Sequence, residues 1–195
     1  MPTQAEPMDH RCRAVEAFCE ECVWTRSIRT HFADLFEADT GTGSLLAATA
    51  SIFFHDLNAV LIEYILLQQC KLTDPATSGP GRDNLTSNYI LTLDWTMESR
   101  GILTAANADL MTFREKVIDA RRKLVAHLDR RARLESISLG AFSQDEEAKF
   151  WSALQAFVDA AHGEAVGGPY PIEATMMGDA NNLLHALRDA QARAP

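Results

Sequence analysis

The sequence has little of what fibrous chains, disordered chains and β-sheets require. It contains only ten glycines and seven prolines in 195 residues, and these are clustered, which is typical of a soluble globular protein. No run of alternating apolar and polar residues is long enough for a sheet, and no internal repeat is present. These absences leave an all-α fold as the expected class.

Export and membrane signals are also missing. Residues 1–16 lack the apolar centre of a secretory signal, so we interpret the four cysteines as reduced thiols. The most apolar window, Leu45 to Leu67, is interrupted by His55, Asp56 and Glu63, which would be costly in hydrocarbon. We therefore expect a cytoplasmic protein without a membrane partner, in which this window is a buried helix.

Apolar residues recur at spacings of three and four along most of the chain, which predicts a bundle of about five or six helices. We expect one domain over residues 1–195, with a core at about 8–163 and a C-terminal helix at about 172–193. Helices are predicted at about 8–38, 45–71, 84–98 and 104–128, with Gly101 as a break and 74–84 as a loop. The Ser143-x-x-Glu146 pattern predicts a capping box on a helix that ends near His162.

Positive charge gathers in one short segment. Residues 114–133 hold eight Lys and Arg against three acidic residues, a net charge of +5, whereas the whole chain carries −9. The rest of the chain therefore carries −14. This asymmetry predicts a local anion site on a body that repels anions, which favours a ligand that bears phosphate.

The same segment contains an Arg-x5-His spacing, Arg121 to His127. Histidine titrates near pH ~6.5 and can take up or release protons at neutral pH. Cutting RNA without a metal requires one proton removed from the 2′-hydroxyl, one given to the leaving oxygen, and cations for the phosphorane. Six residues of straight helix rotate by about 240°, so a second copy across a two-fold axis is favoured to complete the site. The alternative is a surface histidine beside a solvated stripe of arginines.

The run Arg121 to Asp129 resembles the R-polar-K-x-x-A-H-x-D motif of the HEPN superfamily, which comprises all-α proteins of bacterial defence and toxin systems. Residues 53–67, 71–75 and 84–86 resemble the second-helix region of the abortive-infection U-type branch. The resemblance therefore spans roughly residues 53–129.

The resemblance implies a homodimeric, metal-independent ribonuclease that needs no cofactor. It implies that Arg121 and His127 are catalytic. We assign supporting roles to Arg122 and Asp129, and contacts with the RNA backbone to Lys123, Arg130 and Arg131. A toxin or phage-defence role is implied, with an antitoxin or a nucleotidyltransferase as a possible further partner.

One position departs from the family motif. The residue after the arginine is usually Asn, whereas this chain has Arg122. Two alternatives stay open, because Arg122 could bind phosphate in place of Asn or could mark a member that has lost its activity. A non-catalytic dimer that binds nucleotides or proteins in a defence system is therefore the competing function.

The sequence offers two candidate metal sites, and neither is favoured. His10, Cys12, Cys19 and Cys22 are zinc-ligand types, but the three cysteines share the spacing of one buried helical face. His55-Asp56 is expected to form a hydrogen-bonded polar spot in the core. We therefore predict no metal site.

Overall fold

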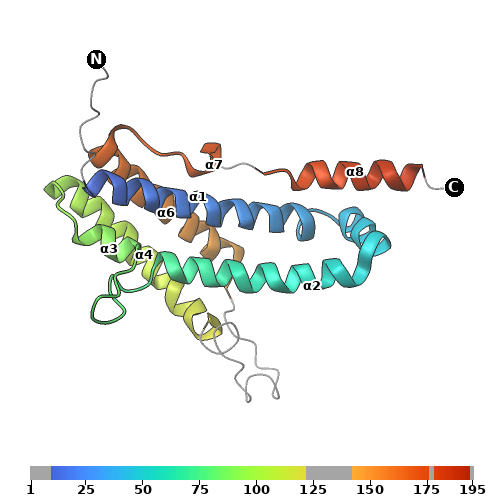
Figure 1. Ribbon diagram of the computed structural model, residues 1–195, viewed down its shortest axis with the longest axis horizontal. Helices are drawn as coiled ribbons and strands as arrows, with labels where there is room; N and C mark the ends of the chain where they lie inside the picture. The colour runs from blue at the N-terminus through green and yellow to red at the C-terminus, as the bar shows by residue number, and fades with distance from the viewer. Residues whose placement is uncertain (1–9, 122–141, 176–177, 194–195) are drawn as a thin grey trace.

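The structure is a computed structural model that describes residues 10–121, 142–175 and 178–193 (Figure 1). The regular elements in these ranges are all helices, apart from an isolated antiparallel bridge between Thr77 and Asp83. The predicted all-α fold is confirmed.

Long and short helices follow one another along the described ranges. They are α1 (His10–Phe36), α2 (Thr40–Leu72), α3 (Ser87–Thr92), α4 (Met97–Ala120), α6 (Gln144–His162), a π-helical turn η2 (Gly163–Gly167), α7 (Ile172–Thr175) and α8 (Ala180–Ala192). In Figure 1, α1 and α2 lie side by side, α3, α4 and α6 gather near the start of α1, and α8 lies near its end.

The apolar side chains form two separate clusters. The larger one joins α1, α3, α4, α6 and the end of α2, and its fully buried members include Phe18, Leu110 and Phe157. The smaller one joins the end of α1, the first part of α2 and α8 through Leu35, Phe54, Leu184 and their neighbours. Between the two clusters, α2 buries only part of its middle, where Phe54 is covered and its neighbours Ile52 and Phe53 are exposed.

The middle of α2 is exposed, so the prediction of a buried central helix was wrong. Only 17% of its most apolar 18-residue window is buried, although by length and composition alone this helix could cross a membrane. The exposed side chains include Ile52 and Phe53, and also His55 and Asp56, which were expected in the core. Nothing else in the described chain covers this surface, which leaves apolar area in contact with solvent.

The helices between residues 84 and 120 begin and end differently from the prediction. Thr86 caps α3, as one of the two expected residues, but α3 ends at Thr92 instead of near Glu98. Thr96 then caps α4, which runs through Gly101 without a break. A single glycine inside a helix costs about 1 kcal/mol relative to alanine, which the long buried face of α4 outweighs.

The C-terminal part holds one confirmed and one wrong prediction. The Ser143–Glu146 capping box is present, and α6 ends at His162 as expected. The single helix predicted at 172–193 is instead two helices, because α7 ends at Thr175 and α8 begins at Ala180. Gly178 and Asp179 precede α8, and both residue types favour a helix start over a helix interior.

Candidate functional site

Arg121 is the first residue beyond α4, and its backbone N–H still bonds to the carbonyls of Val117 and Ile118. The register of α4 is set by a buried face of apolar residues that includes Leu103, Leu110 and Val117. Because this face is held in the larger core, the position of Arg121 at the end of the helix is defined by packing.

The Arg121 side chain bonds to Asp74, which lies just after α2. Its two terminal nitrogens donate to the two carboxylate oxygens, Nη1 to Oδ1 at 2.9 Å and Nη2 to Oδ2 at 3.0 Å. This is the two-pronged geometry in which a planar guanidinium matches a carboxylate best. The side chains are 27% and 16% exposed, so the pair is shielded from solvent but remains accessible.

A second arginine shares the same carboxylate. Nη2 of Arg114 donates to Oδ1 of Asp74 at 2.6 Å, and Nη1 donates to the carbonyl of Cys70 at 2.6 Å and to Oγ1 of Thr73 at 3.2 Å. Arg114 is only 10% exposed. We call Arg114, Asp74 and Arg121 the arginine–aspartate cluster, and its formal charge is +1.

The cluster opens into a polar cavity of about 530 Å³. Lys71, Asn84 and Thr86 line it together with Asp74 and Arg121, and acidic Glu21 and Asp83 stand on its wall. The lining therefore combines two cations, three carboxylates and several hydrogen-bonding groups, which suits a polar ligand of modest size that contacts Arg121 and Lys71.

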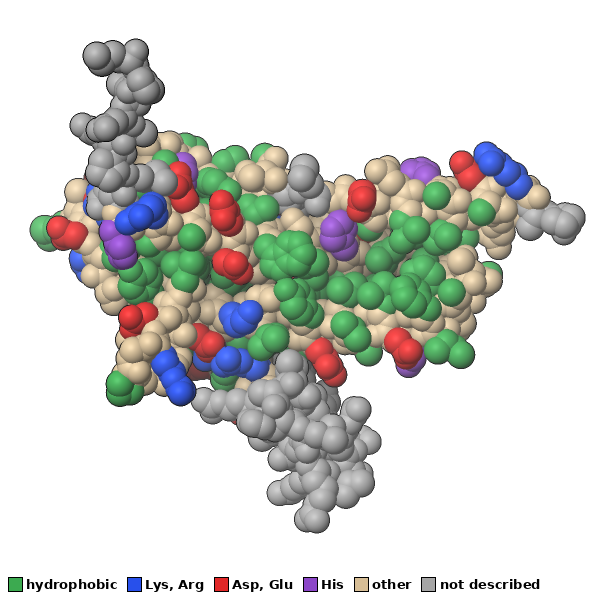
Figure 2. Space-filling model, viewed as in Figure 1, with side chains coloured by type: hydrophobic (Ala, Val, Ile, Leu, Met, Phe, Trp, Pro, Cys, Tyr) green, Lys and Arg blue, Asp and Glu red, His purple; other side chains and the backbone are tan. Residues whose placement is uncertain are grey.

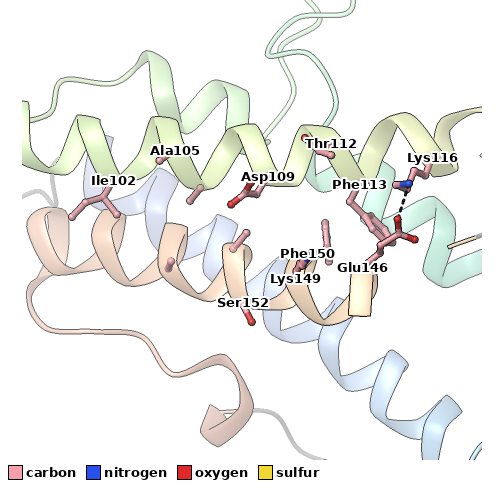
Figure 3. Close-up of a pocket in the computed structure, with 13 residues that line it drawn as sticks. Ile102, Ala105, Asp109, Thr112, Phe113, Lys116, Glu146, Lys149, Phe150 and Ser152 are labelled. Atoms are coloured by element: carbon pink, nitrogen blue, oxygen red, sulfur yellow. Dashed lines mark ion pairs between the residues drawn. The ribbon is translucent and has the colours of Figure 1, made fainter. Parts of the chain in front are cut away.

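A larger groove of about 960 Å³ lies between α4 and α6 (Figure 3). Its floor is mainly apolar, with Phe113 and Phe150, and its charged pair Lys116–Glu146 is closed at 2.7 Å. Arg121 is not among the residues that line it. The groove also carries Asp109 and Lys149, but no residue of the predicted site lines it, so the candidate site is the cavity at Arg121.

Of the predicted site residues, only Arg121 lies in the described part of the chain. The other six, Arg122, Lys123, His127, Asp129, Arg130 and Arg131, lie outside the described residues. The structure thus places one member of the predicted catalytic pair in a polar cavity, and the assignment of the others stays a prediction.

Two residues of the cluster were not singled out from the sequence. In the sequence, Asp74 falls in the predicted loop and in the 71–75 segment that resembles the family, and Arg114 falls in the basic segment, but neither is given a role at the site. Arg114 and Arg121 are seven residues apart, so they lie on one helical face two turns apart and could have been paired from spacing alone. The approach of Asp74 depends on how the chain leaves α2, which spacing along α4 does not reveal.

The cysteines of α1 are part of the core. Burial raises the pKa of the Cys19 thiol to about 12 and also raises the pKa of Cys22, so both stay protonated. Among the described residues, no group of three or more His, Cys, Asp or Glu side chains is arranged to hold a metal ion. Thiolates are the form that binds zinc, and these buried thiols do not supply it.

The comparisons with known proteins agree with the fold. A family model named HEPN AbiU2 matches residues 8–183, which is most of the chain. No curated protein and no solved structure gives a match. The matched region includes both Asp74 and Arg121, and it contains α1, α2, α4 and α6 in full. The chain therefore belongs to the HEPN AbiU2 family, the U-type branch of abortive-infection HEPN domains.

Proposed function

We propose that the protein is a metal-independent endoribonuclease that acts as an abortive-infection or toxin effector. The observation that carries the proposal is the position of Arg121, the first residue of the family motif, which lies at a partly exposed ion pair on a polar cavity. A catalytic cation must be both fixed and accessible, and Arg121 meets both conditions.

In this proposal His127 transfers the protons and Arg121 stabilises the charge that builds up on the phosphorane. A guanidinium stays charged at any physiological pH and can donate several hydrogen bonds to phosphate oxygens. Lys123, Arg130 and Arg131 hold the RNA backbone, while Arg122 and Asp129 support the pair. The excess of negative charge on the rest of the chain limits unspecific binding of RNA.

We further propose that the active form is a homodimer that packs along the middle of α2. Ile52, Phe53, Val60 and Ile62 are 78%, 61%, 59% and 42% exposed, and all four lie on this one helix. Large apolar side chains that are exposed together on one helix mark an interaction site. Figure 2 shows how hydrophobic side chains gather where α1, α2 and α8 run together.

The charges on α2 favour a second copy over a lipid bilayer as the covering partner. His55, Ala59 and Glu63 are all exposed and follow one another at four-residue spacing, so they share a face. If two α2 helices pack antiparallel with the two-fold axis at Ala59, His55 of one protomer faces the partner's Glu63. Such a pairing is self-complementary, as a two-fold interface requires, whereas both charges would be costly in hydrocarbon.

The proposed setting is the cytoplasm, where an antitoxin or a nucleotidyltransferase would be an additional partner. Deleting the proposed antitoxin gene, if one adjoins this gene, is then expected to make expression of the protein toxic.

The experiment that tests cleavage compares the rates at which wild type and four variants cut RNA in excess chelator. Wild type is expected to cut, and Arg121→Ala and His127→Ala are each expected to cut at least about 100-fold more slowly. Arg13→Ala and His185→Ala are matched controls, because both residues are exposed and lie on α1 and α8, away from the cavity. If wild type binds RNA or nucleotides but leaves them intact, the protein is instead a non-catalytic binding dimer.

A further inference from the structure

We infer that Asp74 is a positioning residue that holds the Arg121 guanidinium in the orientation needed for catalysis. The inference rests on the proposed function, because it assigns a role within that same site. It concerns a residue outside the basic segment, and it depends on contacts that join the end of α2 to the end of α4.

The geometry of the contact fixes the plane of the guanidinium. A single hydrogen bond would let the group rotate, whereas two parallel bonds at 2.9 and 3.0 Å define both its direction and its plane. The contact uses two of the five N–H donors of an arginine. Other donors of the same group can therefore contact a phosphate oxygen while Asp74 holds it.

The charge of Asp74 is needed to keep two arginines together. Arg114 and Arg121 both donate to Oδ1, at 2.6 and 2.9 Å, so their guanidinium groups approach one another at one oxygen atom. Without the carboxylate, two like charges would repel at this distance. With it, the three groups together keep a formal charge of +1.

Asp74 is itself held by contacts that do not involve Arg121. Nδ2 of Asn88, on α3, donates to the carbonyls of Thr73 and Asp74, both at 3.0 Å. Nδ2 of Asn107, on α4, donates to Oδ1 of Asn88 at 3.0 Å. Asn107 is 8% exposed, so this chain of amides is largely shielded from solvent.

Arg114 supplies the third support, since it binds the Cys70 carbonyl and Thr73 Oγ1 as well as the Asp74 carboxylate. Thr73 is fully buried. The segment that carries Asp74 is thus fixed from α2, α3 and α4 at once. Arg121, by contrast, is a long side chain at the end of a helix, so the direction of control runs from Asp74 to Arg121.

The first test is Asp74→Asn, which keeps the size of the side chain and removes its charge. A misplaced catalytic group costs about 100-fold in rate, so kcat is expected to fall about 100-fold with KM changed less than about threefold. Asp189→Asn is the matched control, because Asp189 is exposed on α8, does not line the cavity and loses the same charge. It is expected to stay within about twofold of wild type. Asp74→Glu, which retains the carboxylate, should recover most of the lost rate.

A double-mutant cycle separates positioning from general destabilisation. If Asp74 acts through Arg121, then adding Asp74→Asn to Arg121→Ala should not lower kcat further. Asn88→Ala is a second variant, which leaves all three charges in place and removes the support of the Asp74 backbone. It is expected to lower kcat in the same direction by a smaller factor.

A measurement of the Arg121 side chain by NMR makes the inference independent of activity. The Nη–H signals of Arg121, assigned with Arg121→Lys, belong to the donors that bond to Asp74, and they should exchange slowly in wild type and much faster in Asp74→Asn. If wild type cuts no RNA, the proposed function fails, and these signals still decide whether Asp74 holds Arg121. Two results overturn the inference: unchanged Arg121 signals in Asp74→Asn, or a kcat for Asp74→Asn equal to that of wild type.

Discussion

At the scale of single residues, the direction in which the Arg121 guanidinium donates hydrogen bonds is controlled by geometry and not by protonation. An arginine is charged throughout the physiological range, so only its neighbours decide where its donors point. Asp74 directs two of those donors, and Arg114 shares the same carboxylate. A lysine at position 121 would keep the charge and lose this planar contact.

The thiols give a prediction at the same scale. Because burial raises the pKa of Cys19 to about 12 and raises that of Cys22, neither should form thiolate near pH 8. Cys12 is only half-buried. In the native protein at pH 8, we expect iodoacetamide to label Cys12 at least about tenfold faster than Cys19 or Cys22, measured by peptide mass spectrometry.

The control for this labelling is the denatured protein, in which all four cysteines should react. Rapid labelling of Cys19 or Cys22 in the folded protein would contradict the packing of α1 in the core.

Arg121 and Asp74 also show which residues of the site could be predicted from the sequence and which could not. The Arg-x5-His spacing identified Arg121 because a motif is local in the chain. Asp74 lies 47 positions away and meets Arg121 only through the packing of α2 against α4. A contact of that kind is set by tertiary structure. The spacing of residues within one sequence does not reveal it.

At the scale of helices, apolar periodicity located the elements, and local hydrogen bonds between side chains and the backbone decided their ends. Trp95 donates from Nε1 to the carbonyl of Ile90, and Thr96 caps α4. These bonds divide the helix predicted over 84–98 into α3 and the first turn of α4. The capping box of α6 was predictable because both of its partners lie within four residues of each other.

The cap of α6 leads to a stability prediction. Oγ of Ser143 accepts a hydrogen bond from the backbone N–H of Glu146 at 3.2 Å. Ser143→Ala is therefore expected to lower the free energy of unfolding by about 1 kcal/mol, measured by urea titration. Ser152→Ala is the matched control, because Ser152 is exposed within the same helix, and it should leave the stability unchanged or slightly raised. Equal losses for the two variants would argue against the cap.

The Glu146 carboxylate, the second partner in the capping box, predicts that the stability depends on pH. The hydrogen bond from Lys116, together with that from the backbone N–H of Ser143, lowers the pKa of Glu146 from 4.5 to about 2. A lowered pKa in the folded state means that the stabilisation is present above pH 4.5 and is lost as pH falls toward 2. The difference in stability between wild type and Glu146→Gln should therefore shrink over this window.

The loss of stability between pH 4.5 and pH 2 is measured by urea titrations at a series of pH values. The same titrations on Lys116→Met should show a smaller effect of pH, since the main cause of the lowered pKa is then removed. A difference between wild type and Glu146→Gln that stays constant from pH 5 to pH 2 would contradict the assignment.

At the scale of the whole molecule, the exposed middle of α2 is the main departure from the sequence prediction. The apolar pattern of residues 45–67 predicted a helix correctly, and it predicted burial because apolar residues are usually covered. Periodicity does not say which surface covers a helix. Here the two clusters of the same chain cover its ends, and the proposed cover for its middle is a second protomer.

The dimer is tested by charges placed on this surface. Ile52→Asp and Val60→Asp are each expected to shift the protein from dimer to monomer, measured by size-exclusion chromatography with light scattering, because a buried unpaired carboxylate is costly. Ile102→Asp is the matched control, since Ile102 is a 46% exposed apolar residue on α4. It should leave the dimer intact.

Circular dichroism should report the same helical content for all three variants, so that dissociation is not confused with unfolding. A wild-type protein that is monomeric at every concentration tested would overturn the proposed interface.

The most direct test of the proposed activity is the chemical identity of the RNA ends that wild-type protein leaves in excess chelator. Attack by the 2′-hydroxyl, with His127 moving protons and Arg121 stabilising the phosphorane, predicts fragments that end in a 2′,3′-cyclic phosphate, identified by mass spectrometry. Intact RNA, or fragments that end in a 3′-hydroxyl and form only when divalent ions are added, would contradict it.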